Sequence, residues 1–206
     1  MSVRRGPGAG RAVEVLQRAA ALLLVATLAG CSLLGEKGGV QGRPEVDRFE
    51  MNARVAVRFG TDGYTGNLRW RHTQARDTVD IFTPVGTLYA RLVRDAGGAV
   101  IEMADGKRDS DTDAGTLSRR VLGWELPLDA MPYWVFSRPS PGAEPERFDV
   151  TPEGRPALLQ QAGWRVRYQT FFEDAAQVLP EKLELDRAGL KVKLIVSRWG
   201  QPAAAP

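Results

Sequence analysis

Hydrophobic and polar residues alternate along much of this chain. Apolar side chains occupy almost every second position over residues 49–59, and a second such run covers residues 64–71. A period of two predicts β-strands with one buried face and one face in water. Thr61-Asp62-Gly63 separates the two runs, and Asp-Gly is a strong signal for a hairpin turn. The two runs are therefore expected to form one long antiparallel hairpin.

The alternation recurs along most of the remaining chain. An Asp105-Gly106 turn favours another hairpin, and the apolar positions of the last long run alternate with Lys191, Lys193, Ile195 and Ser197. Antiparallel strands with one wet face fit this pattern, and a sheet of about ten strands is expected to curl. The sequence thus predicts one mainly β domain, with further strands at 79–81, 88–92, 99–103, 148–150, 164–169, 183–185 and 190–197.

The middle of the chain follows a helical period instead. Asp113 is a suitable N-cap for a helix over residues 114–122, and Gly123 is a suitable stop. A second short helix is expected to begin at Pro127 and to be kinked at Pro132. These two helices are the natural cover for the apolar concavity of a curled sheet.

Residues 1–30 have the pattern of a secretory signal. Four arginines precede an apolar run at 19–29, which is too short to cross the ~30 Å hydrocarbon core of a bilayer. Leu28-Ala29-Gly30-Cys31 follows and resembles the lipobox of bacterial lipoproteins. In lipoproteins the cysteine thiol is joined to a diacylglycerol, and cleavage falls just before it. Cys31 is therefore predicted to be the lipidated first residue of the mature chain, and Ser32 after it favours the outer membrane.

The net positive charge of the chain lies in this signal segment. The formal net charge is +3, but residues 1–30 hold four arginines and one glutamate, and the rest of the chain is formally neutral. Nucleic acid is therefore not predicted as a partner. Residues 31–45 are rich in glycine and polar residues and are expected to form a flexible tether. The β domain is expected to span residues 46–200, with a frayed tail at 201–206.

Candidate chemistry is sparse. One cysteine and one histidine cannot form a disulfide framework or a Cys/His zinc site. His72 is expected to be a partly exposed turn residue, and no Gly-x-Ser-x-Gly elbow or phosphate loop accompanies it. The acidic run 109–113 reads as solvated surface. The sequence therefore predicts no catalytic residue, no metal site and no cofactor, and we do not expect an enzyme.

One turn is unusual for its apolar tip. Thr83-Pro84-Val85-Gly86 suits a type I turn, which leaves Val85 where polar residues are preferred. Either Val85 folds back onto the sheet, or it is presented to a membrane or a partner.

Several segments, taken in order, resemble the LolB family of outer-membrane lipoprotein-insertion proteins. Ser137 is a visible departure, because the family usually has glycine at that position. The matching segments are Leu28–Cys31, Phe49–Val57, Gly66-x-Leu68-x-Trp70, Pro84–Leu88, Leu122-Gly123, Leu126–Leu128, Trp134, Gly163-Trp164-x-Val166-x-Tyr168, Leu179-Pro180 and Leu190–Trp199.

This resemblance implies an incomplete, half-open antiparallel β-barrel that is covered by a short helical lid and encloses a hydrophobic cavity. It also implies a monomer, anchored at the periplasmic face of the outer membrane, that takes acylated lipoproteins from a LolA-like carrier and places their acyl chains in the membrane. Pro84, Val85 and Gly86 would form the membrane-insertion turn. The expected cavity residues are Met51, Val55, Leu68, Trp70, Ile81, Leu92, Leu117, Val121, Leu122, Trp134 and Leu185.

The physical cost of exposing lipid fits this expectation. An acyl chain of about fifteen methylenes costs on the order of 10 kcal/mol to expose to water. Without a nucleotide site, transfer has to run downhill in affinity. Three rival interpretations stay open at this point: a lipid-anchored, lipocalin-like carrier of a small hydrophobic ligand, a hydrolase on the same scaffold, and a structural lipoprotein without a cavity of ~300 Å³.

Overall fold

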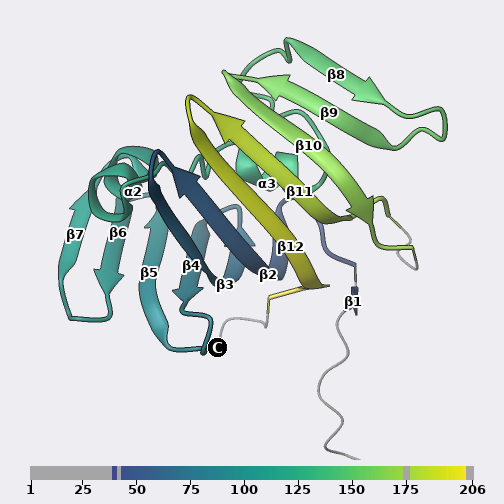
Figure 1. Ribbon diagram of the computed structural model, residues 1–206. Helices are drawn as coiled ribbons and strands as arrows, with labels where there is room; N and C mark the ends of the chain where they lie inside the picture. The colour runs from purple at the N-terminus through teal and green to yellow at the C-terminus, as the bar shows by residue number, and fades with distance from the viewer. Residues whose placement is uncertain (1–38, 41–42, 174–176, 203–206) are drawn as a thin grey trace, which may run out of the picture. The chain divides into compact units, whose positions relative to one another are not determined.

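The strands in the described part of the chain differ in length and form one sheet, which is almost entirely antiparallel. The structure is a computed structural model, and it describes residues 39–40, 43–173 and 177–202. The expected signal segment and Cys31 lie outside these residues. The strands follow the order β7-β6-β5-β4-β3-β2-β12-β11-β10-β9-β8 (Figure 1). Their bounds are β2 (Arg48–Phe59), β3 (Asp62–Thr73), β4 (Arg76–Phe82), β5 (Leu88–Asp95), β6 (Gly98–Met103), β7 (Arg108–Asp111), β8 (Arg147–Val150), β9 (Pro156–Gln161), β10 (Trp164–Phe171), β11 (Pro180–Arg187) and β12 (Leu190–Gly200).

The sheet is open, because its path ends at β7 and β8 instead of closing on itself. The one parallel pairing involves the two-residue strand β1 (Gly39–Val40), which lies beside Arg198 and Trp199 of β12. Strand β11 pairs with β12 only as far as Ile195, and beyond that residue β1 lies beside β12 in its place. Residues 39–40, which fall inside the range expected to be a tether, are thus part of the sheet.

Two helices join β7 to β8 and cover the inner face of the sheet. Helix α2 (Ala114–Leu122) packs against β6 and β7, and α3 (Met131–Val135) lies within the curve of the sheet (Figure 1). The inner face carries the alternating apolar side chains, which merge with those of the helices into one buried cluster. The expected mainly β, half-open barrel with a helical lid is confirmed.

Several details differ from the sequence expectation. The β2–β3 hairpin turns at residues 60–61, because Asp62 already pairs with Phe59 and Gly63 lies in the strand. Strand β9 was not expected, since its sequence Pro-Ala-Leu-Leu-Gln-Gln does not alternate. Helix α3 begins at Met131 and not at Pro127. Pro132 therefore lies in its first turn, where a missing N–H costs nothing, and no kink is needed.

Ser137 ends helix α3 in a left-handed conformation. Its φ is +59°, and the backbone N–H groups of Ser137 and Arg138 donate to the carbonyls of Trp134 and Tyr133 at 3.0 Å each. This is the Schellman arrangement, in which glycine is favoured because a Cβ crowds the backbone. The Ser137 hydroxyl is buried and finds no hydrogen-bond partner in the described structure. This gives a physical reason for the glycine that the resemblance leads one to expect at this position.

Ser137→Gly is expected to stabilise the protein. It removes the left-handed strain and an unpartnered buried hydroxyl, each worth about 1 kcal/mol, against a smaller entropic cost of glycine in the unfolded chain. Thermal denaturation is expected to show a melting temperature a few degrees higher, on the order of 2–4 °C per kcal/mol. Ser140→Gly, after the same helix, is the control and should not raise it.

Candidate functional site

Helix α2 forms the first part of the lid and is fixed by charged and capping contacts. The Asp113 side chain accepts a hydrogen bond from the Thr116 backbone N–H at 2.7 Å, and hydrogen bonding to the side chain and backbone of Thr116 lowers the pKa of Asp113. Arg120 donates to Asp109 and Asp111 of β7, at 2.8 Å each. The acidic run expected to be solvated surface thus carries the contacts that hold α2 over the edge of the sheet.

Helix α3 is fixed to the other side of the sheet by buried hydrogen bonds. Gln161 of β9 is almost fully buried, and its carbonyl oxygen accepts from the Trp134 indole and the Ser140 backbone, at 2.8 Å each. Its amide donates to the carbonyls of Ser140, at 2.7 Å, and Ala143. The Tyr168 hydroxyl donates to the Trp134 carbonyl at 2.9 Å, and burial raises the pKa of Tyr168. This end of the lid is therefore rigidly attached.

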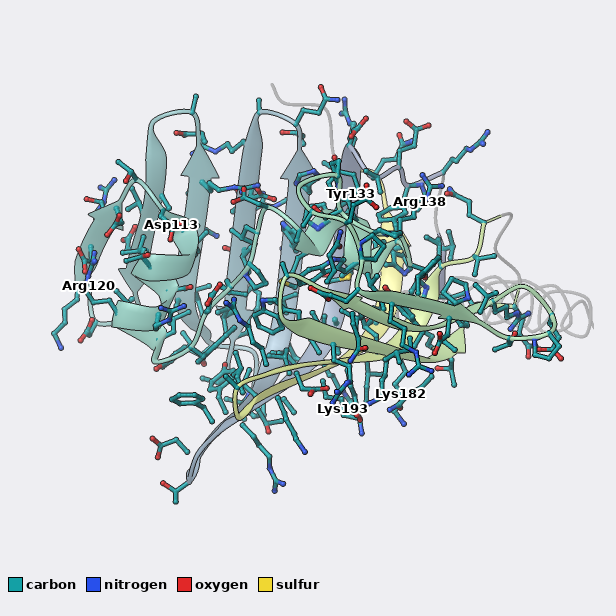
Figure 2. All side chains as sticks on the ribbon, turned by 90° about the horizontal axis from the view of Figure 1, so that it is seen from above. Asp113, Arg120, Tyr133, Arg138, Lys182 and Lys193 are labelled. Carbon is teal, nitrogen blue, oxygen red and sulfur yellow. The ribbon has the colours of Figure 1, made fainter. Side chains whose placement is uncertain are left out.

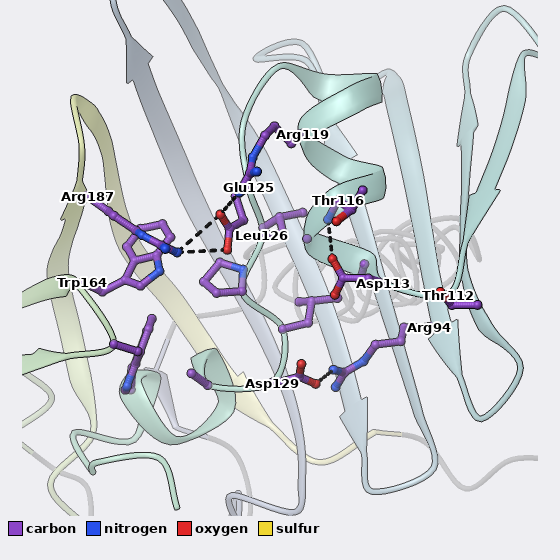
Figure 3. Close-up of a pocket in the computed structure, with 17 residues that line it drawn as sticks. Arg94, Thr112, Asp113, Thr116, Arg119, Glu125, Leu126, Asp129, Trp164 and Arg187 are labelled. Atoms are coloured by element: carbon purple, nitrogen blue, oxygen red, sulfur yellow. Dashed lines mark hydrogen bonds and ion pairs between the residues drawn. The ribbon is translucent and has the colours of Figure 1, made fainter. Parts of the chain in front are cut away.

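The segment between the helices, residues 123–130, is called the strap here. Ion pairs fasten it: Glu125 accepts from Arg119 of α2 and, at 3.2 Å, from Arg187 of β11, while Asp129 pairs with Arg94 of β5 (Figure 3). A pocket of about 310 Å³ lies against the strap, bordered by Leu126, Trp134 and Trp164 as well as by these charged groups. The strap is thus held by these partly exposed ion pairs and by the side chains of Trp124, Leu126 and Leu128, which are buried in the core.

The eleven expected cavity residues all belong to the packed core. Nine are buried, and Val121 and Leu122 of α2 are partly buried against the same cluster. Among the eleven, only Trp134 borders the pocket at the strap. The side chains that the sequence singled out therefore fill the concavity between sheet and lid, and an acyl chain could enter only if the lid moved away.

A buried polar network crosses the inner face beneath the strap, and sequence reasoning missed most of it. His72 was expected to be partly exposed at a turn, which is wrong: it lies in β3, 7% exposed, with Nδ1 2.7 Å from Asp77. Asp77 also accepts from the Trp70 indole at 2.7 Å and from Arg94 Nε at 2.9 Å. Arg94 continues to Asp129 of the strap. The sequence feature that could have indicated this network is Asp77, a charged residue at an inward position of β4.

The Thr83–Gly86 turn projects from the sheet. The Gly86 N–H donates to the Thr83 carbonyl at 2.9 Å, and Gly86 has a φ of +90°, which completes a type I turn followed by a left-handed residue. Val85 is 88% exposed, the most exposed large hydrophobic side chain of the described residues. It does not fold back onto the sheet.

Close packing behind this turn fixes its position. The Tyr64 hydroxyl donates to the Phe82 carbonyl at 2.7 Å, directly beside Gly66. A Cβ on Gly66 would lie 2.1 Å from that same carbonyl oxygen, so the position requires glycine. The turn is thus a rigid platform for one apolar side chain.

The described residues lack two features that would suggest other functions. No helix there is both long and apolar enough to cross a membrane. No group of three or more His, Cys, Asp and Glu side chains there is placed to hold a metal ion.

Comparisons with known proteins agree with this architecture. The family model of the outer membrane lipoprotein LolB matches residues 47–199. The chain is 35% identical over 190 residues to the outer-membrane lipoprotein LolB of Chromobacterium violaceum, covering 90% of this chain and 99% of the relative. It is 34% identical over 152 residues to that of Azoarcus sp. strain BH72, covering 74% and 78%.

A solved structure shares the fold. The crystal structure of a LolA superfamily protein from Nitrosomonas europaea aligns with a TM-score of 0.50 at 13% identity, covering 80% of this chain and 90% of the other. At this identity the likeness concerns the fold alone. The open sheet, the helical lid and the match over residues 47–199 together show that the chain belongs to the outer membrane lipoprotein LolB family.

Proposed function

We propose that this protein is an outer-membrane lipoprotein that receives acylated lipoproteins from a soluble periplasmic carrier and inserts them into the outer membrane. Its own acyl anchor is attached at Cys31, behind a signal segment at 1–30. The incoming acyl chains lie between the inner face of the sheet and the lid. Pro84, Val85 and Gly86 form the turn that enters the bilayer. The names of the relatives support the membrane and the lipoprotein class; the LolA-like carrier is the partner that such a receptor requires.

One observation carries this proposal: the apolar inner face is closed by a lid that is attached unequally at its two ends. Buried hydrogen bonds hold α3 to β9 and β10, whereas partly exposed ion pairs hold the strap. Exposed ion pairs are worth only ~0.2–1 kcal/mol each, while buried polar groups left without partners cost ~1–3 kcal/mol each. Opening on the side of the strap and α2 therefore leaves fewer buried polar groups without partners than opening at α3, which makes α3 the pivot.

The energy for transfer comes from burial alone. Each methylene that leaves water contributes ~0.8 kcal/mol, so acyl chains stay buried at every step. Without lipid, the lid packs directly on the sheet. Lipid binding has to break these lid–sheet contacts, and this cost lowers the net affinity for lipid. That loss leaves the bilayer as the more favourable final environment.

Glu125→Gln is expected to speed the loading of acyl chains. It weakens the contacts of the strap with Arg119 and Arg187 by about 1 kcal/mol, which corresponds to roughly fivefold more open lid. A fluorescent acylated peptide added to the purified protein measures the loading rate. Asp105→Asn, which breaks a comparable exposed pair with Lys107 away from the lid, is the control. Equal loading rates for Glu125→Gln and the unaltered protein would exclude the strap as the gate.

A further inference from the structure

The outer face of the central strands carries an excess of positive charge. The outward positions of β2, β3 and β12 hold arginines and lysines, and Glu50 is the one carboxylate that these three strands place there. Figure 2 shows Lys182 and Lys193 on the side of the sheet away from Tyr133 and Arg138 of the lid region. The domain is nearly neutral overall, so this charge is a local property of the outer face.

Part of this charge is not balanced by neighbouring carboxylates. Arg71, Lys193 and Arg198 form ion pairs with Asp80, Glu184 and Glu50, at 3.0, 3.2 and 3.8 Å. In the part of the chain that the structure describes, Arg54, Arg58 and Lys191 have no ion pair. All three are exposed. They are free to bind an anion from solution or from a surface.

A groove of about 650 Å³ runs across this face to the Val85 turn. Arg54 lies opposite Ile195 on one neighbouring strand and Asn67 on the other, and Asn67 lies opposite Phe82. The Arg69 guanidinium is 5.8 Å from the centre of the Phe82 ring. The groove ends at Gly86, the residue after Val85, and one carboxylate, Glu181, borders it. Cationic and apolar side chains thus stand together next to the turn.

We propose that this groove binds the phosphate head groups of anionic phospholipids when the Val85 turn touches the bilayer. A bilayer offers both chemistries in the required order, with phosphates at the surface and hydrocarbon beneath them. Arginine is suited to this place because its guanidinium holds phosphate while its stem lies along apolar surface. This inference rests on the proposed function, since it assumes that Val85 enters the membrane.

An environment-sensitive fluorophore at position 85 tests the inference on the acylated protein. Cys31 is the one cysteine of the chain, and the proposed acylation occupies its thiol, so the Val85→Cys variant has a single free thiol for labelling. The labelled protein is incorporated into vesicles of phosphatidylethanolamine alone or with phosphatidylglycerol. The label should enter the bilayer more when phosphatidylglycerol is present, and sodium chloride should reduce that gain by screening. Inorganic phosphate at equal ionic strength should have no additional effect.

Arg54→Glu should reduce entry of the label into phosphatidylglycerol vesicles on the order of tenfold, because each charge near an anionic surface has a substantial effect on partitioning. Arg54→Lys should retain it. Arg108→Glu is the matched control, an exposed arginine on β7 at the far edge of the sheet. An equal loss with Arg108→Glu would mean that only net charge matters, and would overturn the proposal.

Two other outcomes also decide the matter. If the label enters every vesicle equally and Arg54→Glu slows only delivery from the carrier, the groove binds a protein and the inference is wrong while the proposed function stands. If the label enters no vesicle of either composition, the proposed role of Val85 itself is wrong.

Discussion

Val85→Glu is expected to block the release of lipoproteins into membranes while leaving the fold and the loading of acyl chains unchanged. Val85 is 88% exposed and contributes little to the core, so its replacement should change stability by no more than ~0.5 kcal/mol. An ionised carboxylate, in contrast, is costly to bring into hydrocarbon, by ~2.5 kcal/mol or more at depth. Transfer of an acylated lipoprotein from this protein to vesicles should therefore fall at least about tenfold.

Val150→Glu is the matched control for this experiment. Val150 is also an exposed valine, at 56%, but it lies on the edge strand β8, outside the Thr83–Gly86 turn. The Val150→Glu variant should transfer lipoproteins normally. Undiminished transfer by Val85→Glu would contradict the role of the turn and favour a carrier of free small ligands, which has no need of an apolar tip.

Gln161→Leu is expected to cause the largest loss of stability of any single change discussed here. It leaves the Trp134 indole N–H, the Ser140 N–H and two backbone carbonyls without partners in a buried site. Because leucine fills a similar volume, the loss comes from polar groups and not from a cavity. About 3 kcal/mol is expected, which corresponds to a fall in melting temperature of roughly 10 °C.

Gln160→Leu, one residue earlier and on the opposite face of β9, separates this effect from the general effect of replacing glutamine. It should shift the melting temperature by about 1 °C or less. Denaturation followed by circular dichroism measures both variants. A small effect of Gln161→Leu would mean that α3 is not the fixed end of the lid, and the pivot would have to lie elsewhere.

The alternating pattern predicted the sheet well because the period of two depends only on which face is buried. The sequence also predicted α2, through a helical period with the N-cap Asp113 and the stop at Gly123, since these signals are local. It missed β9, where both faces carry mixed residues, and it placed the start of α3 too early, because proline at 127 and at 132 each suit a first helical turn.

The candidate site was predicted less completely. Apolar inward residues could be read from the period, but whether they enclose a space or fill it depends on the position of the lid, which no local pattern encodes. The roles of Gln161, Asp77 and Arg94 depend on partners 17 to 35 residues away along the chain. Ser137 could be noticed as a departure from the family pattern, but its left-handed φ gave the reason.

In the proposed mechanism, acyl chains lie between the lid and the inner face of the sheet. A photo-crosslinking amino acid at Leu122, which is partly buried against the core, tests it directly with a lipoprotein that carries a radiolabelled acyl chain. Position 120, on the same helix but facing Asp109 and Asp111, provides the control. We expect the labelled acyl chain to be captured from position 122 and not from position 120. Capture from position 120 alone, or from neither position in protein that is loaded with lipoprotein, would contradict it.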